Sequence, residues 1–157
     1  MTITLLAIGK TDNPQLIQLI EDYKKRLGFY INFKFEIIPD LKNAKNFGEI
    51  QQKEKEGELI LKKITKSDTF ILLDENGKQL SSVDFSNYLQ KHMNSGIKNL
   101  FFVIGGPYGF SKEIYQRANG KISLSKMTFS HQMVRLFFIE QLYRGFTILR
   151  NEPYHHR

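Results

Sequence analysis

Asn99-Leu-Phe-Phe-Val-Ile-Gly-Gly-Pro-Tyr-Gly109 is the most informative stretch of this 157-residue chain. Its apolar residues, Leu100 to Ile104, run without interruption, which is typical of a strand buried on both faces of a parallel sheet. Gly105-Gly106-Pro107 then turn the chain, and glycine lets a backbone approach a ligand closely because it carries no Cβ atom. Ligands of open α/β sheets bind beyond the carboxyl ends of the strands. The stretch therefore predicts a binding site at its own end.

Strand and helix patterns alternate along the rest of the chain. We expect strands at residues 3–8, 33–37, 69–73, 100–104 and 121–125. We expect helices at residues 14–27, 43–65, 82–95, 112–118 and 130–150. Strict alternation predicts an α/β fold in which helices flank a mostly parallel sheet. No linker or repeat interrupts the pattern, so we expect a single domain over residues 1–157.

Short-range signals predict where several elements begin and end. Asn13 before Pro14 predicts a capped helix start, because the asparagine side chain accepts N–H bonds and proline suits the first helical position. Ser81 and Ser111 predict two further caps. Asn76-Gly77 predicts a turn directly after the strand at 69–73.

Composition narrows the classes of partner. The chain has 23 Lys and Arg against 16 Asp and Glu, a net charge of +7, which favours a polyanion such as nucleic acid but also serves solubility. It has no cysteine, which excludes disulfides and thiolate metal sites and fits a cytoplasmic location. Neither a secretory signal nor a run long enough to span a membrane is evident. We expect no membrane partner and no metal.

Familiar nucleotide and hydrolase motifs do not match. The glycines after Ile104 follow a late strand, and no acidic residue lies between Glu113 and Glu140, so the dinucleotide fingerprint fails. The phosphate-binding loop motif and the Gly-x-Ser-x-Gly elbow are both absent from the sequence.

Three chain reversals follow predicted strands: Leu73 to Glu75, Gly105 to Phe110, and Leu124 to Phe129. If these strands are neighbours, their carboxyl ends form one pocket rich in backbone N–H and C=O groups, which can bind an adenine edge without charged side chains. Apolar residues of the reversals would enclose the ring: Leu73, Leu124, Met127 and Phe129. Alternatively, these residues belong to the core and the glycines only make turns, which composition alone favours.

Four motifs carry a family resemblance: Gly105-Gly-Pro-Tyr-Gly109, Leu124-Ser-Lys-Met-Thr-Phe-Ser-His-Gln-Met-Val-Arg135, Glu140-Gln-Leu-Tyr-Arg144 and Pro153-Tyr-His155. Together they resemble the small SPOUT-class methyltransferases that methylate N3 of a pseudouridine in 23S ribosomal RNA. The similarity runs from Leu6-Ala-Ile-Gly9 to the tail. Ser130 departs from it, because the family often has proline there.

The resemblance implies S-adenosylmethionine as the methyl donor, a homodimer, 23S rRNA within the ribosome (large subunit or 70S) as the substrate, and a C-terminal deep trefoil knot, an exception to the usual absence of knots. It places the cofactor contacts at the three reversals: Leu73, Gly105, Leu124, Ser125, Lys126, Met127, Thr128 and Phe129.

The N3 proton of pseudouridine must leave at or after attack, which calls for a proton acceptor or a cation near the base. The candidates are His131, Arg135, Tyr154 and His155. Each has a structural alternative: a helix cap for His131, an exposed basic face for Arg135, and a docked or frayed tail for the last two. Glu140 and Arg144 have the spacing of an ordinary ion pair, so we leave both out of catalysis.

Contacts with RNA phosphates are expected from basic residues: Lys10, Lys112, Arg135, Arg144 and Arg150. Two alternatives remain open at this point. One is a non-catalytic RNA-binding or ribosome-binding protein of the same fold, and the other is a methyltransferase with a different RNA target.

Overall fold

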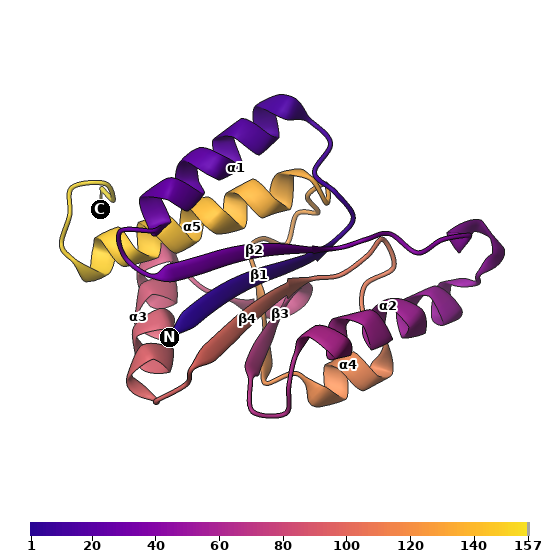
Figure 1. Ribbon diagram of the computed structural model, residues 1–157. Helices are drawn as coiled ribbons and strands as arrows, with labels where there is room; N and C mark the ends of the chain where they lie inside the picture. The colour runs from indigo at the N-terminus through magenta and orange to yellow at the C-terminus, as the bar shows by residue number, and fades with distance from the viewer. Residues whose placement is uncertain (157) are drawn as a thin grey trace.

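The sheet has five strands in the order β2-β1-β4-β3-β5, and every neighbouring pair is parallel. A computed structural model describes residues 1–156 (Figure 1). The strands are β1 (Thr2–Ile8), β2 (Asn32–Ile38), β3 (Thr69–Gln79), β4 (Asn99–Ile104) and β5 (Gly120–Ser123). The predicted parallel α/β architecture is confirmed. Because all strands run the same way, their carboxyl ends lie along one edge of the sheet.

Helices cover both faces of the sheet (Figure 1). The helices are α1 (Pro14–Leu27), α2 (Glu49–Lys63), α3 (Ser82–Asn94), α4 (Lys112–Arg117) and α5 (Met133–Leu149). Helices α1, α3 and α5 pack on one face, and α2 and α4 pack on the other. The family's trefoil knot stays a prediction.

The central strands feed two separate cores because their side chains alternate between the faces. In β4, Phe102 and Ile104 pack with α3 and α5, whereas Phe101 and Val103 pack with α2 and α4. Phe102 and Val103 are fully buried, as expected for a strand covered on both sides. The two helical layers therefore explain why the apolar run at residues 100–104 is unbroken.

The predicted helix caps at Asn13, Ser81 and Ser111 are confirmed. The last helix begins later than expected, at Met133, because residues 130–132 form a turn in which the Ser130 Oγ accepts the Met133 N–H at 3.0 Å. Strand β5 is also shorter than predicted and ends at Ser123.

The helix predicted over residues 43–65 divides in two. A short 3-10 turn, η1 (Ala44–Asn46), follows Asn43 in the left-handed region at φ 58°, and α2 starts only at Glu49 after an extended Phe47-Gly48. Gly57, in the middle of α2, allows a close approach: a Cβ atom there would lie 2.8 Å from the Ser111 Oγ at the start of α4.

The turn predicted at Asn76-Gly77 was wrong, because β3 continues to Gln79 after a bulge. Its pairing with β5 shifts register between Leu73 and Lys78, so residues 74–77 leave the ladder before the strand resumes. The Asp74 Oδ1 accepts the Asn76 N–H at 2.8 Å, which stabilises the bulge. A Cβ atom on Gly77 would lie 2.4 Å from the Ile122 carbonyl carbon, so only glycine lets the chain rejoin β5 there.

Candidate functional site

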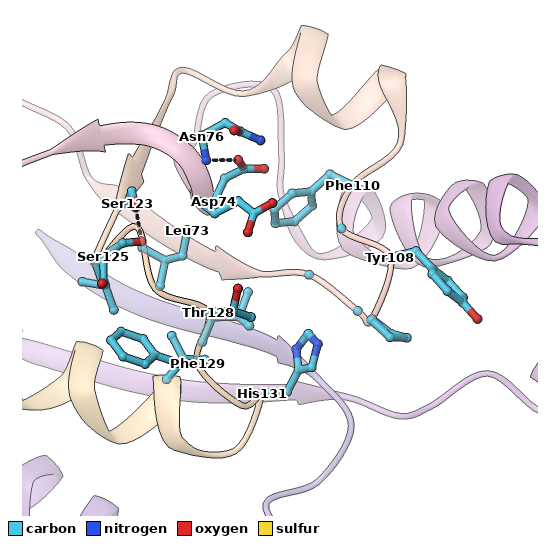
Figure 2. Close-up of a pocket in the computed structure, with 18 of the residues that line it drawn as sticks. Leu73, Asp74, Asn76, Tyr108, Phe110, Ser123, Ser125, Thr128, Phe129 and His131 are labelled. Carbon is cyan, nitrogen blue, oxygen red and sulfur yellow. Dashed lines mark hydrogen bonds between the residues drawn. The ribbon is translucent and has the colours of Figure 1, made fainter.

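A cavity of about 440 Å³ lies at the carboxyl ends of β4 and β5 and at the bulge of β3, the strand between them in the sheet (Figure 2). Its size falls within the usual range for small-molecule sites. Residues from all three predicted chain reversals line it: Leu73 to Asn76, Ile104 to Phe110, and Ser123 to Phe129 without Lys126. Tyr115, His131 and Val134 complete the lining. The three segments converge on one cavity as predicted, but residues 73–75 do not reverse the chain, because β3 continues through its bulge to Gln79.

One wall is the bulge of β3, fastened to α4 by a hydrogen bond. The Tyr115 hydroxyl donates to the Asp74 Oδ2, and both residues line the cavity. Burial and the neighbouring Asp74 carboxylate raise the pKa of Tyr115, so its hydroxyl keeps its proton and remains a donor at neutral pH. Asp74, Asn76 and Phe110 lie together on this side of the cavity (Figure 2).

The second wall is the loop from Gly105 to Gly109, which turns tightly after β4. The Gly109 N–H donates to the Gly106 O at 3.1 Å, and Gly109 has φ +81°, a conformation that favours glycine. A Cβ atom on Gly105 would lie 3.1 Å from the Phe110 ring. The glycines therefore keep this wall thin and expose backbone atoms to the cavity.

The third wall is the loop from Leu124 to Phe129, which is stabilised by its own serines. The Ser123 Oγ donates to the Ser125 O at 2.8 Å, and the Met127 N–H donates to the Ser125 Oγ at 2.9 Å. Phe129 packs against Phe137 of α5, with ring centroids 5.0 Å apart. Lys126 is exposed and is the one residue of the predicted cofactor contacts that does not line the cavity.

His131 is the one predicted catalytic residue that lines the cavity. It lies in the turn before α5 and is exposed, on the side opposite Asp74 in the view of Figure 2. Ser130 makes the helix-capping hydrogen bond in this turn, so His131 is not the helix cap.

Arg135 is buried and its guanidinium is committed to the protein. It is 1% exposed and donates to the Ile8 O, the Gly9 O, the Thr11 Oγ1 and the His131 O at 2.8–2.9 Å. Burial lowers its pKa from the ordinary arginine value, although arginine stays charged at neutral pH. The expected contact of Arg135 with an RNA phosphate is excluded in this arrangement, and so is an exposed basic face. Instead, Arg135 fastens the start of α5 to the end of β1.

Tyr154 and His155 lie at the other end of α5, away from the cavity. The Tyr154 hydroxyl bonds to the Glu140 Oε1 and the Tyr23 hydroxyl, each at 3.0 Å. The Arg144 guanidinium lies 3.4 Å from the His155 Nδ1 and forms the predicted ion pair with Glu140 at 2.5 Å. Helix α5 has 17 residues, which at a rise of 1.5 Å per residue separates its ends by about 25 Å. The tail is docked, and it cannot reach the cavity of its own chain from there.

The charge of the cavity is negative. The sequence predicts a pocket that can bind an adenine edge without charged side chains, and it counts Lys126 among the cofactor contacts. Of the described residues, Asp74 and Glu75 line the cavity, and no lysine or arginine does. Neither carboxylate forms an ion pair with a basic side chain of residues 1–156, and such carboxylates favour a positively charged ligand. The signal was present at the end of the apolar strand, because Asp74 and Glu75 follow it directly. Tyr115 was also missed, since nothing local relates it to Asp74, 41 residues away.

Two negative findings apply to residues 1–156. None of their helices is long and apolar enough to cross a membrane. Within the same part of the chain, no group of three His, Cys, Asp or Glu side chains is arranged to hold a metal ion.

Comparisons with known proteins agree with this geometry. Residues 1–155 match a family model described as "Predicted SPOUT methyltransferase". The chain is 73% identical to the "Ribosomal RNA large subunit methyltransferase H" of Flavobacterium johnsoniae over 157 residues, which is 100% of both chains. It is 60% identical to the protein of that name from Parabacteroides distasonis over 156 residues, 99% of each chain. A crystal structure from Bacillus anthracis, described provisionally as an RNA methyltransferase, has a TM-score of 0.51 at 12% identity and covers 100% of this chain and 99% of its own, a likeness of fold alone.

Proposed function

Because this chain belongs to the SPOUT methyltransferase family, we propose that it methylates N3 of a pseudouridine in 23S rRNA within the assembled ribosome. The full-length relatives are named as methyltransferases of large-subunit ribosomal RNA. The target nucleotide comes from the family resemblance in the sequence motifs, and a ribosomal substrate implies a cytoplasmic enzyme.

The observation that carries the proposal is the convergence of three separate segments on one cavity. Leu73 lies at the bulge of β3, Gly105 follows β4 and Met127 follows β5, and all three line the cavity. The cavity suits S-adenosylmethionine in three respects: its volume, its apolar residues beside backbone polar groups, and its carboxylates. The donor carries a sulfonium and an ammonium group, which Asp74 and Glu75 would attract. We therefore assign donor binding to seven residues: Leu73, Gly105, Leu124, Ser125, Met127, Thr128 and Phe129.

S-adenosylmethionine supplies an electrophilic methyl group when it is bound, so the protein has mainly to orient the two reactants. The Gly105–Gly109 loop and the Leu124–Phe129 loop enclose the donor, and Tyr115 fixes the Asp74 carboxylate on a third side. His131, at the mouth of the cavity, is placed to accept the proton that leaves N3 of the base.

Tyr154 and His155 have a different place in this proposal. They lie at the far end of α5, so they serve the reaction only if they reach the cavity of a second chain. A homodimer, which the family resemblance implies, would bring the tail of one protomer to the cavity of its partner. Lys10, Lys112 and Arg150 are exposed and remain the proposed phosphate contacts, whereas Arg144 is engaged by Glu140.

Mass spectrometry of ribosomal RNA tests this function. A strain lacking the protein should lose one methylated pseudouridine from 23S rRNA, and the purified protein should restore it on isolated ribosomes with S-adenosylmethionine. Calorimetry should show saturable donor binding, which a non-catalytic RNA-binding protein would not give. An unchanged inventory of methylated pseudouridine would reject the target, and loss of another methyl group would name a different one.

A further inference from the structure

Glu56 in α2 is a buried carboxyl group with one oxygen that has no partner. The residue is 3% exposed, and the Gln52 Nε2 donates to its Oε1 at 3.0 Å. The Oε2 makes no hydrogen bond, the one such case among the buried side-chain atoms of the described residues. Because an unpaired buried polar atom is costly, its retention calls for an explanation.

The free oxygen lies against the glycine loop of the cavity. A Cβ atom on Gly106 would lie 2.3 Å from the Glu56 Oε2 and 2.5 Å from its Oε1, so the carboxyl group occupies the space that any other residue at 106 would need. The next residue, Gly57, packs against Ser111 at the far end of the same loop. Helix α2 therefore supports residues 106–111 from behind, and neither Glu56 nor Gly57 lines the cavity.

The same loop has a backbone donor that lacks an acceptor. Gly106 and Gly109 form an antiparallel bridge in which the Gly109 N–H donates to the Gly106 O at 3.1 Å, whereas no acceptor among residues 1–156 is found for the Tyr108 N–H group. The buried Glu56 Oε2 and the Tyr108 N–H thus both lack a protein partner at one loop, which forms a wall of the cavity.

We propose that Glu56 is a positioning residue for methyl transfer, and that its Oε2 accepts a hydrogen bond from the Gly105–Gly109 loop when the donor is bound. This inference rests on the proposed function, because it concerns how that cavity receives S-adenosylmethionine. Glu56 does not touch the donor; it sets the shape of the backbone that does.

The surroundings of Glu56 support this role. Burial raises the pKa of Glu56, the Gln52 bond opposes that rise, and the charge of Asp40 adds to it. Among residues 1–156, no basic side chain forms an ion pair with Glu56. The group therefore gains from any new N–H donor that the loop supplies.

Calorimetric titration with S-adenosylhomocysteine, the demethylated product, tests the proposal. We expect Glu56→Ala to weaken binding about tenfold or more, as the loss of a hydrogen bond to a buried acid does, while Glu56→Gln, whose amide oxygen still accepts, stays within about threefold of wild type. Glu58→Ala changes an exposed carboxylate of the same helix and should bind like wild type. Thermal unfolding of each variant shows whether it is folded during the titration.

A second substitution separates positioning from stability. Gly106→Ala points its methyl group at Glu56 and should weaken binding about tenfold. Glu56→Ala gives that methyl group room, so the double variant should bind no worse than either single variant. If Glu56→Ala does not fold, Gly106→Ala alone decides.

The outcomes distinguish the two proposals. Wild-type protein that binds no product refutes the proposed function and the inference with it. Wild-type binding together with unchanged affinity in folded Glu56→Ala or in Gly106→Ala overturns the role of Glu56 alone. A lower melting temperature with unchanged affinity would make Glu56 a purely structural residue.

Discussion

The two ends of helix α5 are fastened to the body of the protein by different chemistry. The amino end lies at the cavity and is held by Arg135, whose guanidinium binds two carbonyl groups at the end of β1. The carboxyl end carries the tail, which is held by two hydrogen bonds. The Tyr154 hydroxyl donates to Glu140, and the Tyr30 hydroxyl donates to Glu152. Figure 1 shows the tail, in yellow, beyond this second end, away from the loop that enters the helix.

This difference shows which end is built to stay fixed. Arg135 is charged at neutral pH, and its guanidinium is buried. Tyrosine and glutamate bonds at a half-exposed surface can open at little cost. The cavity end is therefore rigid scaffold, and the tail end is the part that a second chain could rearrange.

Removing the arginine should have the largest effect. Arg135→Met leaves the carbonyl groups of Ile8, Gly9 and His131 without donors, so we expect the free energy of unfolding to fall by about 3 kcal/mol or more. Urea denaturation at fixed protein concentration measures this loss. Arg117→Met, which removes one bond to the Thr65 O at the surface, should cost about 1 kcal/mol or less. Equal losses in the two variants would show that the cavity end is not specially fastened.

Mixed dimers test whether the two ends meet across protomers. His131→Ala and His155→Ala should each lower the methylation rate about a hundredfold or more if each group moves or stabilises the proton. Mixing the two variants should restore roughly a quarter of wild-type activity, because half of the dimers are mixed and each has one intact site. Mixtures that stay as inactive as the single variants would place both groups in one site of a single chain, or deny His155 a role.

Alkali should loosen the tail end before the cavity end. The bond that Tyr30 donates to Glu152 raises its pKa from 10.0 to about 12. A raised folded-state pKa adds stability that is complete below the unfolded value and is lost as the pH rises through the folded one. The free energy of unfolding should therefore fall between pH 10 and about 12. Tyr30→Phe should abolish the share of this fall that comes from Tyr30, and it should lower the free energy of unfolding at neutral pH by about 1 kcal/mol. Denaturant titrations across this range measure it, with exposed Tyr108→Phe as the control.

The smallest effect on stability should come from Met127, which is 77% exposed at the cavity. Met127→Ala should change the free energy of unfolding by less than about 0.5 kcal/mol. Product binding should weaken a few-fold, because the side chain would pack on the bound donor. Calorimetry and thermal unfolding of one preparation give both values. A large loss of stability with unchanged binding would make Met127 a core residue instead.

The sequence was most informative where local pattern and burial coincide. The strand at 100–104, the caps at Asn13, Ser81 and Ser111, and the convergence of the three segments were all predictable. The bulge of β3 was not, because it depends on how Gly77 fits against Ile122, a contact between residues far apart in the chain.

The site was predictable in its backbone and less so in its side chains. Glycine residues indicate a tight turn from the local sequence alone, but the burial of Arg135 depends on carbonyl groups about 127 residues away. The same holds for Tyr115, whose link to Asp74 exists only because β3 and α4 are neighbours. Whether the tail is docked or frayed stayed open in the sequence, and so did its distance from the cavity.

The strand order has a consequence for how the chain is made. The first strand pairs with the fourth, and the fifth closes onto the third, and the pocket draws its walls from residues between 73 and 134. A nascent chain that has emerged only as far as residue 120 lacks β5, the Leu124–Phe129 loop and helix α5. The protein therefore gains its ligand-binding surface in one late step, and contacts between such distant segments slow the search for it.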